Sequence, residues 1–256
     1  MAEPSLQDLL SFSTNAAWQA GRITLRYFQT GVQVETKSDD SPVTEADRSA
    51  ERRIAALIQD RFPEDAIVGE EFGDRAGRTP RRWIIDPIDG TKSFVHGVPL
   101  YGVMICVEID GVPSVGVVHL PAMNEMVCAA RGSGCTWNGR PASVSTVSRL
   151  EDALLCATDI ESFAEFGRDG AYRNLAGRVA YCRGWGDCYG HILVATGRAE
   201  IMLDPVMAVW DCAALQPILE EAGGTFTDWI GNPTIRGGNA ISTNGVLFDE
   251  VMRSIA

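Results

Sequence analysis

Two aspartates follow directly on an apolar segment that the sequence predicts to be a strand. The segment Trp83–Ile85 leads into Asp86-Pro87-Ile88-Asp89-Gly90-Thr91. Side chains just beyond a strand end stand on a rigid platform, and Pro87 restricts the backbone between the two carboxylates. We therefore expect Asp86 and Asp89 to point at one spot. Taken alone, the motif could also be a tight turn in which aspartate only shapes the backbone.

Two further acidic residues stand at the ends of predicted elements elsewhere in the chain. Glu70 follows the short apolar run at 66–68, and Asp211 stands at the start of a helix predicted over 210–222. Singly, Glu70 could belong to a solvated acidic loop and Asp211 could be a helix N-cap. Together with the aspartate pair, they predict a cluster of carboxylates.

A carboxylate cluster of this kind is typical of a site for hard divalent cations. Neighbouring carboxylates repel one another unless a cation lies between them, and Mg²⁺ prefers carboxylate, water and phosphate oxygens. Two ions about 3.5–4 Å apart can bind the attacking and the leaving oxygen of an in-line displacement at phosphorus. If a helix begins after Gly90, the amides of Gly90 and Thr91 could also donate to a phosphate. The residues thus predict a site for divalent cations that is suited to displacement at phosphorus.

The composition limits the binding partners and the cellular location that we expect for the protein. The net charge is −12 and would repel nucleic acid and anionic lipid, so we expect no nucleic acid and no membrane partner. Seven cysteines without a C-x-x-C pair indicate reduced thiols. The N-terminal residues lack a secretory pattern and no apolar run is long enough to span a membrane, so we predict a cytoplasmic protein.

The spacing of apolar residues predicts alternating helices and strands that must position the acidic residues. Helices are expected at 6–28, 44–62, 161–177, 188–196 and 210–222, and strands at 66–68, 83–85, 101–109, 115–119, 126–130, 154–157, 179–182 and 199–203. Pro217 predicts a kink in the last helix. The interleaving favours a layered α/β or α+β fold with two closely packed halves, 1–145 and 146–256.

The motifs resemble those of the inositol monophosphatase family. The resemblance rests on Gly69-Glu70-Glu71, on the motif at 86–91, and on Trp210-Asp211-x-Ala213-Ala214 with Glu221-Ala222-Gly223-Gly224, and it covers about residues 37–244. It implies a layered αβαβα sandwich, a homodimer, inhibition by lithium, and two or three Mg²⁺ ions in each active site.

The resemblance also implies roles for individual residues. Glu70, Asp86 and the Ile88 carbonyl would hold one Mg²⁺. Asp86, Asp89 and Asp211 would hold a second, and Glu70 with waters a looser third. Glu70 and Thr91 would orient the attacking water, and the amides of Gly90 and Thr91 would bind the phosphate.

Two residues of the segment 37–47 also resemble functional positions of the family. Lys37 corresponds to a lysine on a mobile loop, and Asp47 to the aspartate that supports catalysis. A surface lysine and a helix cap are the alternative interpretations.

The residues after the aspartate pair depart from the common inositol pattern, in which a neutral residue and then Asn-Phe follow. The form Thr-Lys-x-Phe-x-x-Gly-x-Pro at 91–99 resembles the histidinol-phosphate phosphatase branch instead. His96 stands where that branch often has arginine, and it could approach the site. We expect histidinol phosphate as the substrate. Another inositol or sugar phosphate is the alternative, and a non-catalytic metal- or partner-binding scaffold is a remote one, because no ligand carboxylate is missing.

The segment 183–190 provides candidates for binding the alcohol half of the ester. Asp187 could pair with the ammonium of histidinol, and Trp185 or Tyr189 could line a pocket for its imidazole. Asp187 could equally be the N-cap of the helix that follows.

Overall fold

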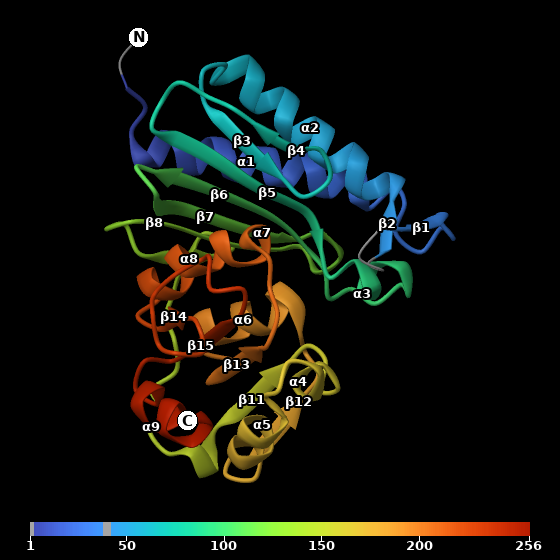
Figure 1. The fold of residues 1–256 in the computed structure, drawn as a ribbon. Helices are drawn as coiled ribbons and strands as arrows, with labels where there is room; N and C mark the ends of the chain where they lie inside the picture. Colours follow the sequence, from blue (N-terminus) through green and yellow to red (C-terminus); the bar gives the residue numbers. More distant parts are fainter. Residues whose placement is uncertain (1–2, 38–41) are drawn as a thin grey trace.

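The computed structural model describes residues 3–37 and 42–256 and stacks them in alternating helical and sheet layers (Figure 1). One sheet has eight strands in the order β10-β9-β8-β7-β6-β5-β3-β4. Its strands are β3 (Ala66–Gly69), β4 (Gly73–Arg75), β5 (Arg81–Asp89), β6 (Gly102–Ile109), β7 (Val112–Leu120), β8 (Glu125–Ala130), β9 (Cys135–Trp137) and β10 (Arg140–Ala142). Neighbouring strands are antiparallel except β3 and β5, which run parallel.

Two long helices, α1 (Leu6–Thr24) and α2 (Glu45–Arg61), cover the outer face of this sheet. The alternation of β5 side chains explains why both faces are covered. Trp83 and Ile85 pack under the two helices, whereas Ile84 between them points into the core on the other face. The predicted capping box at the start of α2 is confirmed. Beyond Thr24, the predicted first helix continues only as turns.

The second sheet has five strands in the order β12-β11-β13-β15-β14. They are β11 (Leu154–Ala157), β12 (Tyr181–Arg183), β13 (Ile201–Asp204), β14 (Thr225–Thr227) and β15 (Ala240–Thr243). The middle layer between the sheets consists of α6 (Asp187–Ala195), α7 (Val209–Ala213) and α8 (Leu215–Glu221), and the far outer layer of α4 (Ser162–Glu165), α5 (Asp169–Ala176) and α9 (Phe248–Ile255). The expected αβαβα sandwich is therefore confirmed.

Five shorter elements complete the described chain. The ribbon of β1 (Val34–Thr36) and β2 (Pro42–Thr44) precedes α2, α3 (Thr91–Val95) follows β5, and 3₁₀ turns lie at Pro121–Met123 and Leu150–Asp152. The strands of the two sheets lie on either side of residues 143–153, and the division into halves at 145 stays a prediction. Within the described residues, no helix combines the length and the apolar character needed to cross a membrane.

Two helices that were predicted to be continuous are each interrupted in the structure. The helix expected over 161–177 is broken around Gly167, which adopts a positive φ of 68° between α4 and α5. The helix expected over 210–222 is divided into α7 and α8 at Ala214. Pro217 thus lies in the first turn of α8, where its missing N–H would have no intrahelical acceptor.

Candidate active site

Asp86 and Asp89 lie on one face of β5 because the strand contains a bulge. Asp86 pairs with Met104 of β6 and Asp89 with Gly102, so three steps along β5 match two along β6. Residues two apart in a strand share a face of the sheet. Asp86 and Asp89 are three apart, but the extra residue of the bulge places both side chains on the same face. The strand end expected at Ile85 and the alternative of a tight turn are both wrong, because β5 continues through Asp89.

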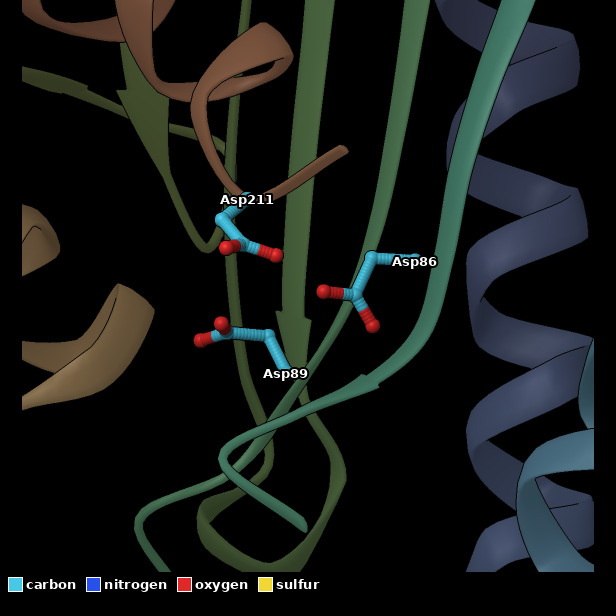
Figure 2. Close-up of side chains that lie close together, drawn as sticks. All are labelled: Asp86, Asp89 and Asp211. Carbon is cyan, nitrogen blue, oxygen red and sulfur yellow. The ribbon is translucent and has the colours of Figure 1, made fainter. Parts of the chain in front are cut away.

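Asp211 completes a group of three carboxylates. Figure 2 shows the side chains of Asp86, Asp89 and Asp211 pointing toward one another, and one oxygen from each lies within 4.8 Å of the others. Asp211 is the third residue of α7, and its Oδ2 accepts a hydrogen bond from the Ala208 amide at 2.7 Å. Asp211 therefore accepts a hydrogen bond from a free amide at the start of α7, and its carboxylate also faces the cluster.

Glu70 reaches the same edge of the sheet from a neighbouring strand. It follows β3, and because β3 and β5 are parallel, their carboxyl ends lie at one edge. The Glu70 amide donates to the Ile85 carbonyl at 3.3 Å, and its Oε1 accepts from the Lys37 ammonium at 2.7 Å. The same ammonium lies 2.6 Å from Oε1 of Glu71. The remaining loop residues 38–41 are outside the described residues.

The acidic cluster is poorly solvated, and the pKa values of its carboxyl groups are raised. Burial is the main cause for Asp86 and Asp89, with smaller contributions from neighbouring carboxylates, and it holds both pKa values well above the ordinary one. Burial likewise raises the pKa of Asp211 to about 6 and lifts that of Glu70. A buried, all-oxygen, mutually repelling donor set fits a hard divalent cation, which would favour the ionised carboxylates.

Thr91 and Asp47 form a second polar pair next to this cluster. The Thr91 hydroxyl lies 2.9 Å from the Ile88 carbonyl oxygen and 3.4 Å from Oδ1 of Asp47. Oδ2 of Asp47 accepts from the Thr44 amide at 2.8 Å and from its hydroxyl. Burial raises the pKa of Asp47 to about 6, although the Thr44 hydrogen bonds oppose the shift. Asp47 is thus both a helix cap and a partner of Thr91.

Gly90 is required by the backbone between the cluster and α3. It adopts φ +83°, and a Cβ there would lie 2.9 Å from the Leu100 carbonyl oxygen and 3.0 Å from Oδ2 of Asp187. Helix α3 begins at the next residue, so the first amides of its turn lack intrahelical acceptors.

A cavity of about 370 Å³ adjoins the carboxylate cluster. Its charged lining residues are six acids and one base: Asp89, Asp159, Glu165, Asp187, Asp204, Asp211 and Lys92. The sequence motifs singled out Asp89, Asp187 and Asp211 among them. The other acids were missed because they lie in segments without a recognisable pattern.

Asp187 lines this cavity in an unusual backbone conformation. It is the first residue of α6 with φ +52°, and the preceding Gly186 is the N-cap, so Asp187 is not the cap itself. Its amide donates to the Thr158 hydroxyl at 2.8 Å. Burial raises its pKa to about 7, and the charges of Asp204 and Asp211 add to the shift. Strained non-glycine residues of this kind cluster at functional sites.

Three other predicted substrate residues are not among those lining the cavity. Trp185 is 40% exposed, and the Tyr189 ring lies beside the Arg198 guanidinium against the central core. His96 is exposed, with Nδ1 2.8 Å from the Lys92 carbonyl oxygen. Their part in substrate binding stays a prediction.

Comparison with known proteins shows which family and which fold this chain shares. Residues 5–254 match the model of the inositol monophosphatase family. The histidinol-phosphatase of Chlorobaculum parvum is 45% identical over 248 residues, 96% of each chain, and that of Mycobacterium tuberculosis is 40% identical over 251 residues, again 96% of each. The crystal structure of the extragenic suppressor protein SuhB from Bartonella henselae superposes with a TM-score of 0.91 at 30% identity, covering 96% of this chain and 98% of that one.

Proposed function

Since this chain belongs to the inositol monophosphatase family and is a phosphatase, we propose that its substrate is histidinol phosphate and that Mg²⁺ assists the hydrolysis. The products would be histidinol and phosphate, a step of histidine biosynthesis. The acidic lining of the cavity beside the carboxylate cluster carries this proposal. The relatives that bear the name histidinol-phosphatase support it independently.

The cavity contains more negative charge than a metal centre needs. If bound ions neutralise Asp89 and Asp211, four acids still line the wall: Asp159, Glu165, Asp187 and Asp204. Of these four, Asp204 is buried and Asp187 is half-buried, whereas Asp159 and Glu165 are exposed, and Lys92 offsets one of the charges. A poorly solvated carboxylate is costly unless it is paired. The ammonium of histidinol would pair with Asp187 and Asp204, whereas inositol is neutral and would not. The charge balance therefore favours an ester of a cationic alcohol.

The cluster of Asp86, Asp89 and Asp211, with Glu70 and the Ile88 carbonyl, would hold the metal ions. Bound Mg²⁺ supplies positive charge to the phosphate oxygens and lowers the pKa of a water molecule. Two ions with a looser third are expected from the family resemblance. Inhibition by lithium is expected on the same ground.

The remaining site residues orient the reactants. The Thr91 hydroxyl would hold the attacking water with Glu70, and Asp47, with its pKa of about 6, would accept a proton through Thr91. The amides of Gly90 and Thr91 would bind the phosphate as its charge develops. Lys37 would hold its loop near the site through its ion pair with Glu70.

Phosphate release from histidinol phosphate and from myo-inositol 1-phosphate tests the proposal. With Mg²⁺ present, we expect kcat/KM to be at least about tenfold higher for histidinol phosphate, since one charge-assisted hydrogen bond contributes about 1.5–3 kcal/mol. Equal rates, or preference for the inositol ester, would instead support the inositol or sugar phosphatase alternative. Activity that survives EDTA would contradict the metal requirement, and absence of activity on any ester would favour the scaffold.

Asp187→Asn should mainly weaken the binding of histidinol phosphate. The amide keeps the size of the side chain and tolerates a positive φ, but it cannot pair with an ammonium group. We expect KM to rise about tenfold with little change in kcat, as measured by steady-state phosphate release. The matched control is Asp159→Asn, which changes a more peripheral acid of the same cavity and should raise KM less. An equal loss on all esters would make Asp187 a structural residue.

Two further properties are proposed from the resemblance and the composition. A homodimer is expected, and light scattering coupled to gel filtration would give its mass. The seven cysteines are free thiols, in agreement with the expected reduced state. The cytoplasmic location stays a prediction.

A further inference from the structure

A buried histidine connects the cavity wall to the second sheet. His191 of α6 is fully buried, its Nε2 lies 3.1 Å from Oδ2 of Asp204, and its Nδ1 lies 2.7 Å from the hydroxyl of Ser242. Ser242 is fully buried as well, whereas Asp204 lines the cavity. The three side chains form a continuous chain from the interior of the protein to the alcohol side of the active site.

The topology of the second sheet brings this group together. Met202 and Ser242 are paired across β13 and β15, so they share a face, and Asp204 lies two residues beyond Met202 on that face. Met202 packs in the core shared with α6, so this face is directed to the middle layer. His191 stands four residues after Asp187 on α6, one helical turn from a residue that lines the cavity.

The hydrogen bonds determine the orientation of the ring. An ionised Asp204 can only accept, so Nε2 of His191 carries a proton whether the ring is neutral or charged. In the neutral ring, Nδ1 then accepts from the Ser242 hydroxyl, which removes the freedom of the ring to rotate or change tautomer. The bond from Nε2 in turn fixes one oxygen of Asp204, and thereby the direction of the whole carboxylate.

We propose that His191, held by Ser242, is a positioning residue that fixes the Asp204 carboxylate on the cavity wall, where it binds the cationic alcohol of the substrate. The identity of the alcohol rests on the proposed function. Asp204 faces the same space as Asp187, and its charge helps to raise the pKa of Asp187. A misdirected Asp204 would therefore weaken recognition of the alcohol without disturbing the residues that bind phosphate.

Ser242→Ala tests the inference with the least change in volume. We expect KM for histidinol phosphate to rise about fivefold, the effect of one hydrogen bond, with kcat changed less than twofold. KM for myo-inositol 1-phosphate and the Mg²⁺ concentration for half-maximal activity should stay the same. Ser242→Thr, which restores the hydroxyl, should recover the lower KM. His191→Gln, which cannot reach both partners, should exceed the effect of Ser242→Ala.

Thr225→Val is the matched control, because it removes a hydroxyl that bonds to Thr243 in the same sheet but is not connected to Asp204. It should leave both KM values unchanged. An equal rise of KM for both esters in Ser242→Ala, or no rise for either, would overturn the inference while the proposed function stands. A wild-type preference for the inositol ester would overturn both. If Ser242→Ala fails to fold, an unchanged ratio of the two KM values in His191→Gln overturns the inference.

Discussion

Asp89→Asn is expected to lower turnover by on the order of 10³-fold or more while the protein stays folded. Asp89 is one of the three carboxylates whose oxygens lie within 4.8 Å of each other, so it would contribute charge directly to the metal ions. Metal-assisted stabilisation of a phosphoryl transition state is worth several kcal/mol, and each 1.36 kcal/mol is a factor of ten in rate. Loss of one ligand charge should remove most of that contribution.

The fold should tolerate this replacement because asparagine retains the shape and one oxygen acceptor. Oδ2 of Asp89 accepts from the Cys188 amide, and the amide oxygen of asparagine can accept the same bond. Circular dichroism and a thermal melt would check the fold, and phosphate release would give kcat. Asp110→Asn is the matched control, because Asp110 is an aspartate of the β6–β7 turn with φ +51°, far from the cluster in the fold. Retention of more than about a tenth of wild-type turnover by Asp89→Asn would contradict the metal-ligand role.

The sequence was sufficient to predict the acids of the cluster because contiguous local patterns mark them. The apolar strand before Asp86, the apolar run before Glu70 and the capping pattern from Thr44 to Asp47 are all contiguous signals. Each of these elements lies within a few residues of its predicted position. In the structure they converge because β3 and β5 are parallel, and parallel strands end at the same edge of a sheet.

The features that the sequence could not provide depend on contacts between distant segments. The bulge in β5 exists because of its register with β6, which local patterns do not encode. The short strands β14 and β15 were missed because three or four residues show no clear periodicity. Asp204, His191 and Ser242 come together only through the pairing of β13 with β15 and the packing of α6, so no motif could have indicated them.

Without metal ions, the protein should become less stable as the pH rises from about 4 to 7. In the unfolded chain an aspartate releases its proton near its ordinary pKa of 3.8, whereas in the folded protein Asp211 keeps its proton to about pH 6 and Asp187 to about pH 7. Between these values the folded state binds more protons than the unfolded state, so the free energy of unfolding falls with increasing pH. Asp211 alone, discounted for its partial exposure, would contribute roughly 2 kcal/mol to this decrease.

Urea unfolding in EDTA at pH 5, 6, 7 and 8 would measure this decrease, and saturating Mg²⁺ at pH 8 should reverse it by favouring the ionised carboxylates. The overall charge of −12 also opposes folding at higher pH, so a variant must separate the local effect from the general one. Asp89→Asn removes one buried carboxyl group whose pKa is raised and should flatten the pH dependence, whereas Asp110→Asn removes an aspartate at a distant turn and should not. A metal-free stability that rises from pH 5 to 8 would mean that burial does not hold these carboxyl groups protonated in the folded protein. The physical basis for a cation site among them would then be lost.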